Sequence, residues 1–337
     1  MATNRCYYID FLKFVGLSLI ILAHVSPPHL LFEFRSMDVP LMVFASGLAF
    51  SGKVVPDFIK FVIPRTKRLV VPVYFFLLVY FSAEFGLYNA GLIKDDISSL
   101  TTVLCSFALL NTKALHFVWI IRVFLFIMIL TPVCLLIEKK CNKNSFVLLI
   151  IFLLISLELI RLLLGTIHPL KPLYYSIYET LPFALGYSVP FLVGLRLRYS
   201  DTRDVCFYIL FFAILLLICF FFFDGNSEYF NVTKYKYPPG SYFICYGTFT
   251  SILLWVVRDR LKSIAFNKYI TFIGQHTIWI YLYHIPILLF IEQYEIGWVE
   301  RYCITYLMSV VLFSLQFVVI TLIEKEKDIA ILKYFKS

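Results

Sequence analysis

Residues 7–25 read YYIDFLKFVGLSLIILAHV, an apolar run in which Asp10, Lys13 and His24 are the side chains that carry a charge near neutral pH. A helix needs about 20 apolar residues to cross the hydrocarbon core of a bilayer, and this run has that length. Its internal charges and its lack of a small-residue cleavage site are atypical of a signal peptide. The sequence therefore predicts a retained membrane-spanning helix at the start of the chain.

The composition shows that the whole chain, like this first run, is rich in apolar residues and poor in charged ones. Of the 337 residues, 61% are hydrophobic and only 15% are charged, and the mean hydropathy is +0.86. Soluble globular proteins carry roughly 45–50% apolar and about 25% charged residues, so a soluble enzyme and a disordered chain are poor fits. We expect an all-α, polytopic integral membrane protein, with a single transmembrane domain over residues 1–337 and no separate soluble domain.

Ten apolar runs can be assigned as membrane-spanning helices. They cover residues 7–25, 39–50, 69–85, 117–137, 145–164, 173–195, 205–223, 241–257, 270–291 and 302–323. The second run is short, and its many small residues favour a short or broken helix packed tightly inside the bundle. Between the third and fourth runs, residues 97–110 are too short and too polar to span, so we interpret them as a re-entrant or interfacial helix.

The distribution of lysine and arginine gives the orientation of these spans. With the N-terminus in the cytoplasm, the cytoplasmic segments hold roughly three times as many of these residues as the outer segments. We therefore expect both termini to be cytoplasmic. The net charge of +9 is then mainly a topology signal with some attraction to anionic lipid, and no nucleic-acid partner is expected.

The charges inside the first span form a pattern. Asp10 and Lys13 are three residues apart, so they share a helical face and can pair. Lys13 and His24 are eleven apart, which is three turns plus about 20°, so both project from one face about 16 Å apart along the axis. Two ordinary interpretations remain open: Lys13 extends to the inner membrane surface, and His24 is a hydrogen-bonded core histidine.

This basic residue, ten intervening residues and then histidine resemble the opening of the membrane-bound acyltransferase-3 family, which O-acetylates carbohydrates. Further elements resemble those of the family in the same order along the chain. They are residues 39–47 (VPLMVFASG, with Ser46), 65–72 (RTKRLVVP), 116–119 (HFVW) and 274–286, which include Tyr281 and His284. The resemblance covers nearly the whole chain.

The resemblance implies transfer of an acetyl group from cytoplasmic acetyl-CoA, in a bacterial inner (cytoplasmic) membrane. The acceptor would be a hydroxyl of a cell-surface polysaccharide or its lipid-linked precursor, and no metal is expected. A sugar hydroxyl is a poor nucleophile at neutral pH, and histidine suits the work of a general base, so His24 is the candidate base. Lys13 and Asp10 would anchor CoA or orient the passage.

The basic segment that precedes the third predicted span offers cations for the phosphates of CoA. Arginine presents a fork suited to phosphate, and Arg65, Lys67 and Arg68 lie together here. Ordinary positive-inside charge explains the same residues equally well. Ser46, Trp119 and Arg122 complete the cofactor-binding candidates.

The candidate acceptor-binding residues are His116, Glu179, Tyr281 and His284. For His284, a packed core histidine and a substrate contact are equally favoured, whereas Glu158 and Arg161 are interpreted as a structural pair. A transporter or flippase of lipid-linked sugars would also have many spans and buried charges. The lack of paired halves in the sequence favours the enzyme.

Overall fold

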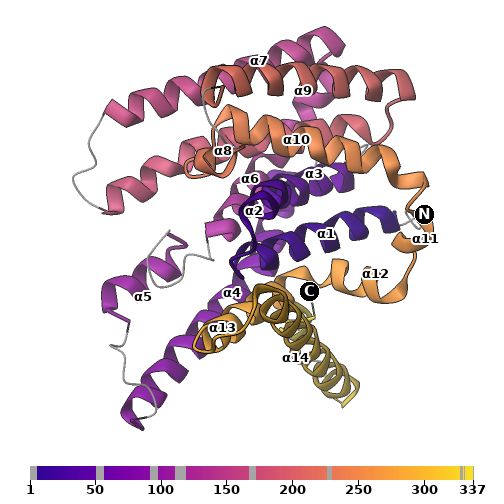
Figure 1. Ribbon diagram of the computed structural model, residues 1–337. Helices are drawn as coiled ribbons and strands as arrows, with labels where there is room; N and C mark the ends of the chain where they lie inside the picture. The colour runs from indigo at the N-terminus through magenta and orange to yellow at the C-terminus, as the bar shows by residue number, and fades with distance from the viewer. Residues whose placement is uncertain are drawn as a thin grey trace.

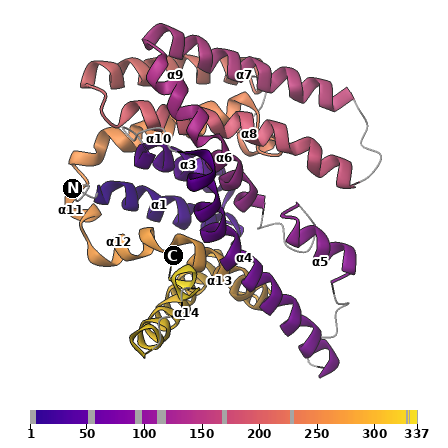
Figure 2. The ribbon, with the colours of Figure 1, turned by 180° about the vertical axis from the view of Figure 1, so that it is seen from behind.

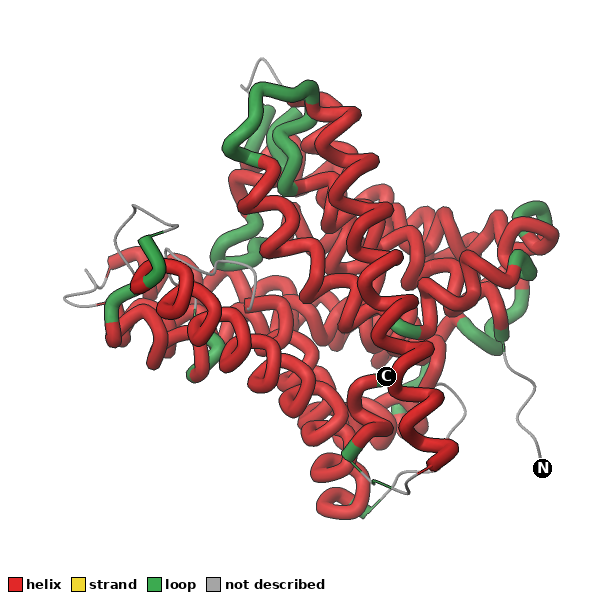
Figure 3. The backbone as a smooth tube through the Cα atoms, turned by 90° about the horizontal axis from the view of Figure 1, so that it is seen from below, coloured by secondary structure: helices red, strands yellow, loops and turns green. Residues whose placement is uncertain are grey.

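The structure, a computed structural model, is helical throughout its described residues. These are residues 6–50, 57–91, 98–110, 119–166, 172–225, 230–326, 329 and 331–336, with the side chains of 165–166 and 172–179 excluded. No strand occurs in these ranges, and Figure 3 accordingly shows only helices and the loops that join them. The all-α class predicted from the sequence is confirmed.

The helices follow one another with short connections. Their bounds are α1 Tyr7–Ala23, α2 His29–Phe34, η1 Arg35–Met37, α3 Asp38–Phe50, α4 Phe58–Asn89, α5 Leu100–Phe107, α6 Trp119–Lys140, α7 Lys143–Thr166, α8 Pro172–Leu197, α9 Thr202–Phe223, η3 Thr233–Tyr235, α10 Ser241–Val256, η4 Val257–Asp259, α11 Lys262–Ala265, α12 Lys268–Gln275, α13 Thr277–Ile291, α14 Trp298–Glu326 and η5 Leu332–Phe335.

Within the described residues, seven helices are long and apolar enough to cross a membrane, so the chain is a multi-pass membrane protein. Each of the ten predicted runs contains helix, but α1 and α3 have only 17 and 13 residues. The predicted ninth span is not continuous, because His276 leaves the helical conformation and separates α12 from α13. The break falls at a short polar stretch, residues 274–277, with apolar residues on both sides, so the sequence pattern was assigned as one span. The number of crossings and the side of each terminus stay predictions.

The third predicted span begins earlier than its apolar run. The Asp57 side chain accepts a hydrogen bond from the Lys60 backbone N–H at 3.0 Å, which caps α4 before the basic segment. Arg65, Lys67 and Arg68 therefore lie on the first turns of a 32-residue helix. The predicted re-entrant or interfacial segment contains the short helix α5.

The helices form a layered bundle around α3. Helices α1, α3, α8 and α10 run roughly parallel, α7 and α9 cover one side, and α4 and α14 run obliquely on the other (Figure 1). The view from behind shows the same order (Figure 2). Helix α3 packs against α1, α8 and α10, whereas α7 and α9 expose large apolar side chains such as Phe152 and Phe222, which are 65% and 80% exposed. This apolar exterior suits contact with lipid.

Two glycines allow α3 and α8 to approach closely. A Cβ atom at Gly47 would overlap the Phe191 carbonyl oxygen, and one at Gly194 would overlap the Phe44 carbonyl oxygen. Small residues at facing positions let helix backbones pack in contact inside membranes. The position of α3, and of the residues it presents to the protein interior, therefore depends on this crossing.

Gly194→Ala is expected to lower the melting temperature of the detergent-purified protein, because the added methyl group forces α3 and α8 apart. Overpacking of this kind typically costs about 1–3 kcal/mol. The matched control is Gly86→Ala on α4, where an added Cβ meets nothing within 4 Å. Equal melting temperatures of the two variants would contradict the close crossing.

Candidate functional site

Two cavities lie along α1 and meet near Ile20, close to its C-terminal end. We name them after the predicted orientation of α1. The inner cavity, of about 330 Å³, includes Lys13 in its lining, and the outer cavity, of about 430 Å³, includes His24. Ile20, Ile120 and Tyr281 line both of them, so the two cavities abut. The Lys13–His24 stripe predicted from residue spacing thus faces cavities inside the protein and not the lipid.

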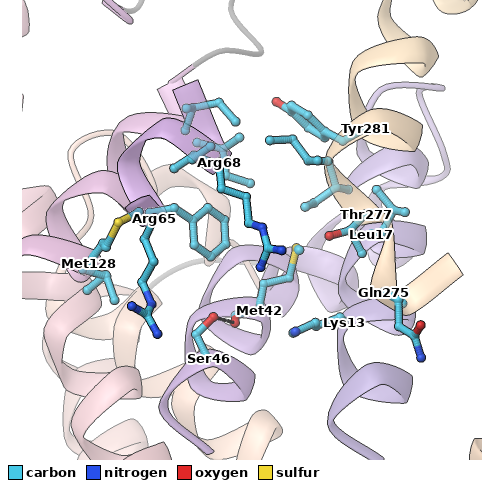
Figure 4. Close-up of a pocket in the computed structure, with 18 of the residues that line it drawn as sticks. Lys13, Leu17, Met42, Ser46, Arg65, Arg68, Met128, Gln275, Thr277 and Tyr281 are labelled. Carbon is cyan, nitrogen blue, oxygen red and sulfur yellow. Dashed lines mark hydrogen bonds between the residues drawn. The ribbon is translucent and has the colours of Figure 1, made fainter. Parts of the chain in front are cut away.

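The inner cavity combines apolar walls with three cations. Lys13 enters it from α1, and Arg65 and Arg68 enter it from α4, as Figure 4 shows. The Arg65 guanidinium lies 3.9 Å from the centroid of the Phe61 ring and donates a hydrogen bond to the Phe61 carbonyl at 3.2 Å. Cations beside an otherwise apolar cleft suit a ligand with an anionic end and a less polar arm.

Other predicted members of this group have different positions. Ser46 lines the inner cavity from α3, and its hydroxyl donates to the Met42 carbonyl at 3.0 Å. Lys67 is exposed and lines neither cavity, although it lies between the two arginines in the sequence. Arg65 and Arg68 are three residues apart and share a helical face, whereas Lys67 projects elsewhere.

Asp10 acts at the contact between α1 and α12. It is buried, and its carboxylate accepts a hydrogen bond from the Gln275 side chain at 3.3 Å. A Cβ atom at Gly274 would overlap the Asp10 carbonyl oxygen, so glycine is required for this approach. Gln275 lines the inner cavity beside Lys13, whereas Asp10 lines neither cavity. Asp10 therefore positions Gln275, a residue of the inner cavity, without lining the cavity itself.

Two imidazoles lie together at the outer cavity. The rings of His24 and His284 are stacked, with 5.5 Å between centroids and 30° between planes. His284 is fully buried, and its Nδ1 donates a hydrogen bond to the Tyr281 carbonyl. His284 does not line either cavity, so the structure places it against His24 and not in the cavity lining.

A buried group of charges forms another wall of the outer cavity. Asp38 accepts from the Arg35 guanidinium at 2.7 Å and from the Lys236 ammonium at 3.0 and 3.1 Å. The three residues, which we call the outer charge cluster, are only 2–4% exposed. In the sequence, Arg35 and Lys236 are two of the cations of the predicted outer segments, and no motif singles out Asp38. Asp38 directly precedes the predicted span 39–50, and a carboxylate beside the membrane is costly unless it is paired. This cost was the signal in the sequence that could have indicated a buried partner.

The loop that carries Lys236 is fastened to α2. Glu33 is 1% exposed and accepts hydrogen bonds from the Thr233 backbone at 2.9 Å and from the Thr233 hydroxyl. Burial lowers the pKa of the Lys236 ammonium to about 8, against the raising effect of the neighbouring Asp38 carboxylate. The ammonium therefore lies where its charge is only partly compensated.

The two candidate residues on α6, Trp119 and Arg122, have different surroundings. Trp119 lines the outer cavity, where its ring meets Tyr237 edge-on with 5.0 Å between centroids. Arg122 is buried, lies 5.2 Å from the centroid of the Phe183 ring, and lines neither cavity.

The remaining predicted residues lie away from these cavities or fall outside the described part of the chain. His116 falls outside the described residues, and Glu179 lies on α8 with its side chain outside them. Glu158 and Arg161 form the expected ion pair at 2.8 Å. Glu158 also accepts from the Ser241 backbone and hydroxyl at 2.6 and 2.7 Å, so this pair holds the start of α10.

The comparisons with known proteins give one match. A family model described as an acyltransferase domain, of the acyltransferase-3 type, matches residues 7–323. No curated protein and no solved structure matches the chain.

Asp38→Asn is expected to destabilise the protein, because it removes the carboxylate to which both buried cations donate hydrogen bonds. Breaking a buried ion pair typically costs about 3–5 kcal/mol. Adding Lys236→Met to this variant should restore part of the melting temperature. Asp201→Asn serves as the control, since asparagine caps a helix as well as aspartate does and Asp201 caps α9 from an exposed position. A melting temperature equal to that of this control would contradict the buried cluster.

Proposed function

The chain belongs to the acyltransferase-3 family and is an acyltransferase, and from this premise we propose that it transfers an acetyl group from acetyl-CoA to a sugar hydroxyl. The acceptor is a cell-surface polysaccharide or its lipid-linked precursor. The enzyme lies in a bacterial inner membrane, with acetyl-CoA entering from the cytoplasm. Membrane lipids surround and contact the enzyme. The reaction uses no metal.

The observation that supports this proposal best is the pair of abutting cavities on one face of α1. The inner cavity has cations for the phosphates of CoA in Arg65 and Arg68 on α4, and Lys13 enters it from α1. Its apolar lining suits the extended pantetheine arm, which can carry the thioester toward Tyr281, where the two cavities meet. An acceptor in the outer cavity would present its hydroxyl beside His24.

The chemistry follows from this arrangement. His24 takes the proton from the acceptor hydroxyl as the oxygen attacks the thioester carbonyl. The carbon–sulfur bond then breaks, the acetyl group stays on the sugar oxygen, and the CoA sulfur leaves and takes up a proton. The stacked ring of His284 restricts the orientation of His24. The Tyr281 phenol, at the junction, is the candidate donor to the carbonyl oxygen as it gains negative charge.

His24→Ala is expected to abolish acetate transfer, since general-base catalysis typically contributes about 10²–10⁴-fold. The measurement is the ester-linked acetate on surface glycans of cells that express the wild-type protein or a variant. Immunoblots of membrane fractions establish that the protein levels are equal. His29→Ala, which removes an exposed histidine of the same outer region, is the control and should keep wild-type acetate levels. Acetate retained at wild-type levels in His24→Ala would eliminate His24 as the base.

Arg65→Ala and Arg68→Ala are each expected to raise KM for acetyl-CoA at least about tenfold, because a hydrogen bond to a charged group contributes about 1.5–3 kcal/mol. Lys67→Ala should have a smaller effect, and Arg260→Ala, which removes an exposed charge outside the cavities, should have none. Steady-state kinetics on purified protein with varied acetyl-CoA provide the test. The assignment is wrong if Arg260→Ala raises KM as much as Arg68→Ala does.

A further inference from the structure

The lining of the outer cavity carries an excess of positive charge. Among its described residues, Arg35, Lys234 and Lys236 are cationic and Asp38 is the acidic residue. Glu33, which accepts hydrogen bonds from Thr233, is a buried carboxylate whose charge also acts on Lys236, but it does not line the cavity. One carboxylate therefore faces two buried cations and a third at the rim.

Asp38 does not satisfy the hydrogen-bonding capacity of the two buried cations. Its two oxygens already receive the Lys236 ammonium, one Arg35 nitrogen and the Val39 backbone N–H. The Nε atom of Arg35 is buried and has no acceptor within the described part of the chain, although the side chain is only 3% exposed. A buried donor without an acceptor is costly, so this arginine has capacity for a further anion.

A purely structural tie between α3 and the loop after η3 would need only one cation. Both buried cations share the hydrogen bonds of Asp38, and Glu33 acts on Lys236 through its charge, so part of the desolvation cost remains. Aromatic rings offset part of this cost: Arg35 lies 4.1 Å from the centroid of Phe32, and Lys236 lies 5.9 Å from that of Trp119. The lowered pKa of Lys236 indicates that this compensation is incomplete.

We propose that the acceptor carries an anionic group, a carboxylate or a phosphate, which binds between Arg35 and Lys236 in the outer cavity. This proposal rests on the proposed function, because it concerns the acceptor of the acetyl group. The guanidinium fork matches either anion, and the ammonium adds a point charge. Binding there holds the sugar in the cavity that His24 lines, and the ring of Tyr237, 46% exposed beside Trp119, offers a surface on which the sugar can stack.

The test uses the purified full chain in phosphatidylcholine nanodiscs, without acetyl-CoA. Three probes of similar size are titrated by calorimetry: D-glucuronate, D-glucose 1-phosphate and D-glucose. At least one of the two anions should bind at least about tenfold more tightly than glucose, and the tighter of the two identifies the carboxylate or the phosphate. Equal affinities of all three probes in the wild-type protein would overturn the proposal, whatever the variants do.

Variants then locate the binding site. Lys236→Met should weaken binding of the preferred anion about tenfold and leave glucose binding unchanged. Lys262→Met removes an exposed lysine outside the cavity and should leave both unchanged. His24→Ala should still bind the anion. Anion binding that is insensitive to Lys236→Met would overturn the assignment to this cavity.

Two further outcomes separate this proposal from others. Loss of sugar-anion binding in phosphatidylglycerol nanodiscs would show that the cluster takes a lipid phosphate, which would overturn the proposal for the acceptor. A protein that binds the sugar anion but transfers no acetyl group would support the anion site and contradict the proposed function. Acetylation of the anionic acceptor at equal rates by wild type and Lys236→Met would do the reverse.

Discussion

The cost of placing charge in a membrane determines much of this structure. A charged side chain at the centre of a helix in hydrocarbon costs about 2.5–3.5 kcal/mol on insertion scales, so each such residue must face the protein interior. Asp10 and Lys13 meet this requirement on α1, one against Gln275 and the other in the inner cavity. The outer helices α7 and α9 instead present large apolar side chains. Some of the polar groups thereby line an internal path formed by the two cavities, whereas Arg122 and the Glu158–Arg161 pair lie elsewhere.

Helix α3 links the two ends of that path. Its first residue, Asp38, holds the outer charge cluster, and Met42 and Ser46 line the inner cavity from the following turns. With 13 residues it is short, and most of its side chains are buried among neighbouring helices. The glycine crossing with α8 fixes its depth and rotation. One rigid element therefore sets the relative positions of both cavities.

Interactions within one helix were predictable from the sequence, and interactions between distant segments were not. The shared face of Lys13 and His24 follows from helical periodicity alone. The same periodicity separates Lys67 from Arg65 and Arg68, but only once α4 is known to begin before them. Lys236 and Asp38 are 198 residues apart, and no local pattern joins them. The stacking of His24 on His284 depends likewise on how α1 and α13 meet.

The boundary between the cavities bears on how a transferase can work across a membrane. Ile20, Ile120 and Tyr281 form this boundary, with apolar surface and one phenol. When the donor enters from one side and the acceptor from the other, only the acyl group has to cross this point. A wide aqueous channel is then unnecessary, and it would be harmful, because it would let ions pass through the bilayer. The division into a basic, mainly apolar cavity and a more polar one matches the different chemistry of the two ligands in the proposed reaction.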